Sequence, residues 1–280
     1  PTGFMAEETF LAVLDEVTAH NTPLRFIRWG EPLLHPHVER YLRLTVERGL
    51  LAHVTTNGSL LSDDLAARLC DMGLPSIKFS FQGVDRESYA AMRNKDFFDR
   101  LLDRVQALHR IRGDRELPYI HASTTITDES PERVARFRER IRTCTDSHQV
   151  GRTVLEHIDP RQVRLSENGK RRLRDLKDRQ SVVRAHAQCH QVFDVLSVNW
   201  DGAVSACCRD FDDLMLVGHM AHGGLSAAWN GPRLAGYRKI LAEMGHDKLP
   251  LCRTCYDLNQ LRLPNVQRIE PEEESACIAE

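Results

Sequence analysis

The sequence predicts an α/β fold, with a parallel sheet in its first part and a small cysteine-rich unit near its end. Over residues 1–160, apolar segments rich in β-branched and aromatic residues alternate with amphipathic segments of helical period. Strand, helix and strand at this spacing favour parallel pairing with right-handed crossovers. Five of the eight cysteines, moreover, lie between residues 189 and 255.

The expected elements follow from apolar pattern and from helix start and stop signals. Ser62 and Ser130 precede acidic or proline-containing first turns and are expected to cap helices, while Gly49 and Gly73 are expected to end them. The expected helices cover 36–49, 62–73, 85–113 with a break near Asn94, and 130–143. The expected strands cover Leu24–Trp29, Leu51–Thr56, Ser76–Phe81, Tyr119–Thr125 and Thr153–Ile158.

The remaining chain divides into three parts. Residues 161–186 are highly charged and are expected to form a helical linker. Within 187–262, the runs Phe193–Val198 and Ala203–Cys207 flank an Asp-Gly turn and predict a hairpin, followed by a helix over Leu225–Met244. Residues 263–280 form a polar tail.

Composition excludes several classes of function. The formal net charge of the 280 residues is −2, which leaves no basic field for nucleic acid. No apolar run approaches the roughly 20 residues that cross a bilayer, and the opening residues do not resemble a signal peptide. We therefore expect a soluble, cytoplasmic protein that binds neither nucleic acid nor membranes.

Polar turns follow the first three expected strands. Their sequences are Arg28-Trp29-Gly30-Glu31-Pro32, Thr55-Thr56-Asn57-Gly58 and Ser80-Phe81-Gln82-Gly83. Each alone is ordinary turn chemistry. In parallel α/β folds, however, ligands bind at the carboxyl ends of the strands. The three turns together indicate a site for a polar ligand that carries an amine, with Glu31 pairing the amine and Asn57 or Thr56 meeting hydroxyl groups.

The C-terminal cysteines indicate a metal centre. Four thiolates from a hairpin and a Cys-x2-Cys turn can surround one tetrahedral metal ion or one [4Fe–4S] cluster. A structural zinc site is the alternative interpretation. Cys70 and Cys144 lie on expected helical faces and are interpreted as core residues, and Cys277 as a thiol of the tail.

These motifs resemble those of radical S-adenosylmethionine (SAM) enzymes. The WGEP, TNG and SxQG turns are similar to the SAM-binding strand ends of that superfamily, and the cysteine spacing resembles its SPASM domain in the shortened twitch form. The resemblance implies a partial (β/α)6 TIM-like barrel followed by a twitch domain built from a β-hairpin and a helix. The implied cofactor-binding residues are Gly30, Glu31, Pro32, Thr56, Asn57, Gly58, Ser80 and Gln82.

The resemblance also implies an auxiliary [4Fe–4S] cluster, with Cys189, Cys207, Cys252 and Cys255 as its ligands. Cys208 is then a hydrogen-atom donor, an alternative ligand or a structural thiol. The superfamily's Cys-x3-Cys-x2-Cys loop, which holds the catalytic [4Fe–4S] cluster, is absent from these residues. We expect that loop on a segment upstream; a degenerate, non-catalytic homologue is the rival explanation.

The implied activity is hydrogen abstraction by a 5′-deoxyadenosyl radical, in a dehydrogenase or an epimerase. The expected substrate is a small polar molecule of the sugar, aminocyclitol or aminoglycoside type, with Arg152, Glu156 and His157 as candidate contacts. A flavodoxin or ferredoxin would donate single electrons. The alternatives are a maturase of a ribosomally made peptide and a non-catalytic scaffold that binds zinc or a cluster through four cysteines.

Overall fold

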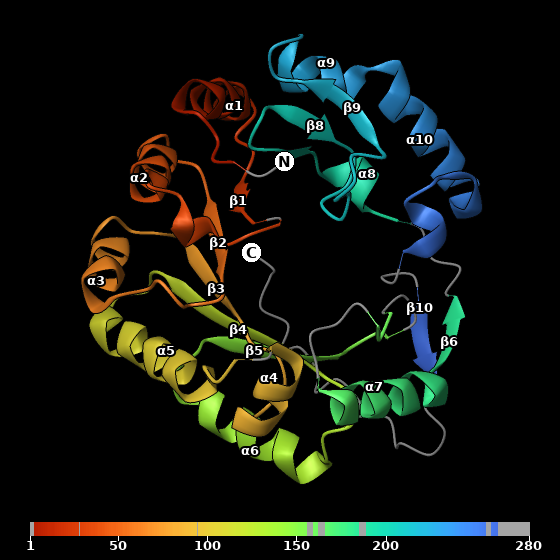
Figure 1. The fold of residues 1–280 in the computed structure, drawn as a ribbon. Coiled ribbons are helices and arrows are strands. Elements are labelled where there is room, and N and C mark those ends of the chain that lie inside the picture. The colour runs from red at the N-terminus through yellow and green to blue at the C-terminus, as the bar shows by residue number, and fades with distance from the viewer. Residues whose placement is uncertain are drawn as a thin grey trace, which may run out of the picture.

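A computed structural model describes residues 3–27, 29–93, 95–155, 159–161, 166–184, 189–255 and 259–262. Five parallel strands form one sheet in the order β1-β2-β3-β4-β5, which confirms the predicted α/β class. The sheet curves into a partial barrel, and α2, α3, α5 and α6 lie along its outer side (Figure 1). The strands are β1 (Leu24–Phe26), β2 (Ala52–Thr56), β3 (Ser76–Ser80), β4 (Tyr119–Ile126) and β5 (Ser147–Arg152).

Capping residues define the helices as the sequence predicts. The Ser62 and Ser130 hydroxyls accept hydrogen bonds from Leu65 N and Arg133 N in the first turns of α3 and α6. Gly49 follows α2 with a positive φ of +74°. The helices of the barrel are α1 (Glu7–Ala19), α2 (Val38–Glu47), α3 (Asp63–Asp71), α4 (Arg86–Arg93), α5 (Phe98–Arg112) and α6 (Pro131–Arg142).

The predicted fifth strand is wrong in position. Strand β5 covers Ser147–Arg152, whereas Thr153–Leu155 is not a strand, and the rest of the predicted segment, 156–158, lies outside the described residues. The strand was missed because Ser147-His148-Gln149 is polar. It pairs in register with β4, where His121 aligns with Ser147, so its position is set by a neighbour and not by its own hydropathy.

The two faces of the sheet differ in polarity. Buried residues such as Val54, Ile77 and Phe79 alternate along β2 and β3 with half-buried polar residues such as Thr55 and Lys78. The buried set belongs to the core that the outer helices cover. Since side chains alternate between faces, the polar set occupies the inner, concave face.

A charged helix and a small antiparallel sheet follow the barrel. Helix α7 (Glu167–Arg179) precedes β6 (Ser181–Arg184), which pairs with β10 (Asn259–Arg262). A three-stranded antiparallel sheet contains β7 (Ser197–Val198), β8 (Ala203–Ser205) and β9 (Leu216–His219). The hairpin β7–β8 is the predicted one, with shorter strands. The domain boundaries proposed from the sequence remain predictions.

The predicted helix over Leu225–Met244 is two helices. They are α9 (Gly224–Asn230) and α10 (Pro232–Ala242), after the short α8 (Gln191–Asp194). Gly231 between them is extended, with φ −70° and ψ 156°. Pro232 then occupies the first turn of α10, where its missing N–H costs nothing.

Helix α1 contacts the C-terminal unit through apolar packing and through one carboxylate. The Glu16 oxygens accept hydrogen bonds from Leu225 N and Ser226 N at the start of α9, each 2.9 Å long. Gly224 has a φ of +67°, and a Cβ there would lie 2.0 Å from Glu16 Oε1, so this contact requires glycine. No helix in the described residues is long and apolar enough to span a bilayer.

Candidate cofactor site and cysteine centre

Glu31 connects the turns after β1 and β2. Its Oε1 accepts hydrogen bonds from Leu33 N at 3.0 Å and from Thr56 Oγ1 at 2.7 Å, and its Oε2 accepts one from Asn57 N at 2.7 Å. Gly30, before it, has a φ of +128°, which a residue with a side chain rarely adopts. Pro32 begins the 3-10 turn η1 (Pro32–Leu34) that directs the chain away from the edge.

This arrangement fits the binding of an amine. A carboxylate offers about four acceptor positions, and three of those on Glu31 are used by the two turns. An acceptor position on Oε2 is left for a further donor. The carboxylate is therefore held in one orientation before any ligand arrives, which lowers the cost of ordering it on binding.

The turn after β2 is fixed by its own side chains. Thr56 Oγ1 accepts a hydrogen bond from Gly58 N at 2.9 Å, and Asn57 Oδ1 accepts one from Ser59 N at 2.8 Å. Gly58 has a φ of +71°, and a Cβ there would lie 2.4 Å from Leu101 Cδ1. The Asn57 amide nitrogen donates to no described residue, so it can meet a ligand hydroxyl.

The third turn lies further along the sheet. Ser80 ends β3 and pairs with Ser123 of β4. Gln82 Nε2 donates to Thr125 Oγ1 at 2.7 Å and to Thr153 Oγ1 at 3.5 Å, so this side chain faces β4 and the residue after β5. The structure thus brings Glu31, Thr56 and Asn57 together after β1 and β2. Gln82 lies further along the same edge of the sheet, toward β4 and β5.

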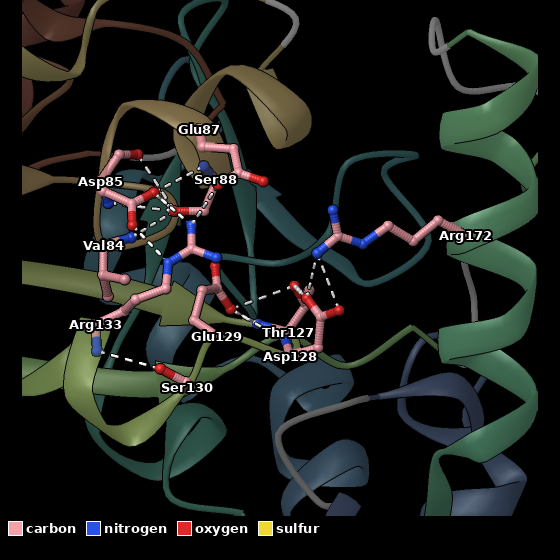
Figure 2. A network of polar contacts seen from close by, with 10 residues as sticks. All are labelled: Val84, Asp85, Glu87, Ser88, Thr127, Asp128, Glu129, Ser130, Arg133 and Arg172. Carbon is pink, nitrogen blue, oxygen red and sulfur yellow. Dashed lines mark hydrogen bonds and ion pairs between the residues drawn. The ribbon is translucent and has the colours of Figure 1, made fainter.

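Ion pairs fix the loops after β3 and β4, as Figure 2 shows. Asp85 accepts hydrogen bonds of 2.6 Å from both Nε and Nη2 of Arg133, and this contact lowers the pKa of Asp85 to about 2. Arg172 of α7 contacts both oxygens of Asp128 at 3.0 Å. Of the predicted substrate contacts, Arg152 ends β5 and is half-buried, whereas Glu156 and His157 lie outside the described residues.

Among the four predicted cysteine ligands, Cys189 lies near Cys207 and Cys252, and Cys255 lies near Cys252. A hydrogen bond with Cys208 and burial raise the pKa of Cys207, and the nearby Cys189 raises it further. Burial, with Cys189 and Cys255 nearby, raises the pKa of Cys252 to about 12. No group of three or more Cys, His, Asp or Glu side chains within the described ranges is already arranged to hold a metal ion. The donors therefore fit a thiolate-bound centre by their chemistry, and binding would draw them together.

The two cysteines of the barrel do not fit a cluster. Cys70 and Cys144 are buried in the apolar core, as the sequence predicts, and burial raises the pKa of each thiol. Apolar surroundings disfavour the thiolates that iron requires. None of the seven described cysteines forms a disulfide.

Sequence reasoning missed Asp210, a fully buried carboxylate beside the Cys207–Cys208 pair. Its Oδ2 accepts hydrogen bonds from Ser205 Oγ at 2.7 Å and from Met215 N at 2.8 Å, and its Oδ1 accepts one from Leu214 N at 2.7 Å. Asp210 thereby closes the loop that carries both cysteines. It is one of three acids between residues 210 and 213, and nothing in the sequence singles it out.

An aromatic contact joins the barrel edge to this same loop. The rings of Trp29 and Phe211 meet edge to face, with their centroids 5.2 Å apart. Both side chains are more than half exposed. The cysteine loop and the turn that carries Glu31 are therefore neighbours.

We expect Asp210→Asn to loosen the cysteine loop. The amide group places a donor where Met215 N or Leu214 N needs an acceptor, which should destabilise the protein by about 1–3 kcal/mol. Urea unfolding of the metal-free protein measures this change, with the exposed Asp212→Asn as the matched control. Equal unfolding midpoints for the two variants would contradict the role assigned to Asp210.

Comparisons with known proteins agree with this geometry. Residues 2–141, half of the chain, match the radical SAM superfamily, and residues 189–256 match SPASM, an iron–sulfur cluster-binding domain. The AdoMet-dependent heme synthase of Methanosarcina barkeri is 25% identical over 140 residues, which are 50% of this chain and 39% of that protein. An uncharacterized Methanocaldococcus jannaschii protein, MJ0804, is 34% identical over 80 residues, 28% of each chain. The chain thus spans well under half the length of these curated relatives.

Solved structures share the fold. BtrN in complex with AdoMet and 2-DOIA superimposes with a TM-score of 0.56 at 18% identity, covering 91% of this chain and 81% of that one. Native anSMEcpe with bound AdoMet gives a TM-score of 0.64 at 14% identity, covering 85% and 75%. The sequence match, the parallel half-barrel and the C-terminal cysteine unit lead to one conclusion: the chain belongs to the radical SAM superfamily and carries a C-terminal SPASM domain.

Proposed function

We propose that this protein is a radical SAM oxidoreductase or epimerase that acts on a small polar substrate. The observation that carries the proposal is the Glu31 carboxylate, held between two strand-end turns with acceptor capacity to spare. SAM, reduced by an iron–sulfur cluster, supplies hydrogen-abstracting radical chemistry when bound. The chain's own residues bind and orient the two reactants and exclude water from them.

In this proposal Glu31 binds the amino group of the methionine moiety, and the turn from Gly30 to Pro32 positions it. Thr56, Asn57 and Gly58 form the ribose side of the site. Ser80 and Gln82 complete the edge toward β4, where Gln82 is held by Thr125. Arg152, together with Glu156 and His157, is proposed to contact the substrate.

The auxiliary [4Fe–4S] cluster is proposed to bind Cys189, Cys207, Cys252 and Cys255. The nearness of Cys189 to Cys207 and Cys252, and of Cys255 to Cys252, supports the assignment. The catalytic cluster is a separate matter, because the matched barrel residues contain one cysteine, Cys70, and it is buried. The family match begins at residue 2 and lends no support to a missing upstream loop. That loop therefore remains a prediction, to be tested by reading the full-length gene for the cysteine triplet.

Partners and substrate class are proposed on chemical grounds. A flavodoxin or ferredoxin would supply single electrons, and a cytoplasmic location is proposed for this exchange. PqqA peptide cyclase of Granulibacter bethesdensis is 30% identical over 81 residues, so peptide maturation is the second candidate. We favour a small polar substrate because half-buried polar side chains line the concave face of the sheet.

Glu31→Gln should weaken SAM binding by roughly tenfold to a hundredfold, since it removes the negative charge that would pair with the amine and that also strengthens the hydrogen bonds holding the two turns. Isothermal titration calorimetry of the anaerobically reconstituted protein measures the affinity. The exposed Glu139→Gln on α6 serves as a matched control. If both variants bind SAM as the unmodified protein does, Glu31 is not the amine-binding residue and the proposed function fails.

Cys208→Ala tests the proposed hydrogen donor. The thiol lies 3.7 Å from Gln191 Oε1, beside the ligand Cys207, and could pass its S–H hydrogen atom to a substrate carbon radical. We expect the variant to keep its iron content but to lose epimerisation, with deuterium from solvent no longer entering product. Full retained activity would assign Cys208 a structural role.

A further inference from the structure

The concave face of the sheet carries a cluster of basic side chains below the proposed cofactor edge. Arg25 on β1 aligns with His53 on β2, and Lys78 on β3 aligns with His121 on β4. His53 and Lys78 share a face, because Ser76, the partner of His53, lies two residues before Lys78. Four neighbouring strands thus direct basic groups toward the same concave surface. We call these four residues the basic cluster.

Neutral hydroxyl groups hold both imidazole rings. His53 Nδ1 lies 2.8 Å from Ser76 Oγ, and its Nε2 lies 3.3 Å from Thr55 Oγ1. His121 Nδ1 lies 2.7 Å from Ser147 Oγ. These contacts fix the rings but contribute no negative charge.

Lys78 has no acidic partner among the residues that the structure describes. It is half-buried, and it makes no ion pair or hydrogen bond with any residue in the described part of the chain. Burial and the nearby Arg25 lower its pKa. Burial and the positive charge of Lys78 likewise lower the pKa of both His53 and His121. Arg25 lowers the pKa of His53 further, and His53 and His148 lower that of His121.

Such an arrangement costs folding free energy. A half-buried cation among other basic groups loses hydration and gains only repulsion. Several other charged residues of the barrel are paired, among them Arg112 with Asp146, Arg133 with Asp85 and Arg40 with Glu7. An uncompensated cluster of this kind is typical of a site that becomes neutral when an anion binds.

We propose that the basic cluster binds an anionic group, a phosphate or a carboxylate, of the substrate, with the Lys78 ammonium as its central contact. This inference rests on the proposed function and narrows its substrate class. An acidic or phosphorylated small molecule fits the concave face, whereas a substrate with an ammonium group at this depth would be repelled.

The position suits a substrate handle. Lys78 and His121 each lie two residues before Ser80 and Ser123 on their strands, which is about 7 Å along a strand. An anion held by the basic cluster would leave the rest of a small molecule beside the strand ends, where the cofactor is proposed to bind. The carboxylate of SAM is the other source of the same chemistry, so the experiment must separate the two.

The test uses the full 280-residue chain, reconstituted without oxygen, and inorganic phosphate as the probe. Calorimetry against chloride at equal ionic strength measures affinity, and NMR of the imidazole C2–H signals measures the pKa values of His53 and His121. Phosphate should bind saturably and raise both pKa values. Lys78→Met should weaken phosphate binding about tenfold or more, and Lys78→Arg should restore it. The exposed Lys95→Met is the matched control.

Stability and SAM binding complete the test. Lys78→Met should keep or raise the thermal unfolding midpoint, because it removes a desolvated charge, and should leave SAM affinity unchanged. Glu31→Gln should weaken SAM binding and leave phosphate binding normal. The two variants therefore distinguish a failure of the proposed function from a failure of the proposed anion site. The inference is overturned if phosphate binds the unmodified protein and Lys78→Met equally, or if Lys78→Met weakens only SAM.

Discussion

The site depends on the Glu31 carboxylate, which holds the turns after β1 and β2 in one geometry. Parallel strands bring their carboxyl ends to one edge, but they do not fix the loops that follow. Glu31 does so by accepting hydrogen bonds from Leu33 N, Thr56 Oγ1 and Asn57 N. The same group is thus structural without a ligand, and in the proposed function it accepts the amine of SAM. Preorganisation of this kind is what a radical enzyme needs, because a misplaced reactant would expose the radical to side reactions.

The same device appears at two other places in the chain. Glu16 accepts two backbone N–H groups at the start of α9 and joins the barrel to the C-terminal unit. Asp210 accepts Leu214 N and Met215 N and closes the loop of Cys207 and Cys208. Charge-assisted bonds to backbone N–H groups are stronger than neutral ones. Three carboxylates therefore position the turns after β1 and β2, the contact between α1 and α9, and the cysteine loop. The contact between Trp29 and Phe211 brings the turn that carries Glu31 next to the cysteine loop.

Sequence could predict the features that depend on local chemistry. The Ser62 and Ser130 caps and the β7–β8 hairpin follow from short patterns, and the structure has them. The position of β5 could not be predicted, because its residues are polar and their place is set by pairing with β4. The break between α9 and α10 at Gly231-Pro232 was not predicted either. Asp210 and Lys78 were also missed. Their importance comes from burial and from neighbours on other strands, which no local pattern records.

The iron, acid-labile sulfide and zinc content of the chain after anaerobic reconstitution is the first quantity to measure, because it identifies the centre that the C-terminal cysteines bind. We expect about four irons and four sulfides per chain, bound by the C-terminal cysteines. A protein that also carries the expected catalytic loop should bind about eight irons and eight sulfides. Cys252→Ser should lose about four irons, those of the auxiliary centre. About one zinc and no iron would instead make the four-cysteine unit a structural zinc site and would rule out the proposed auxiliary cluster.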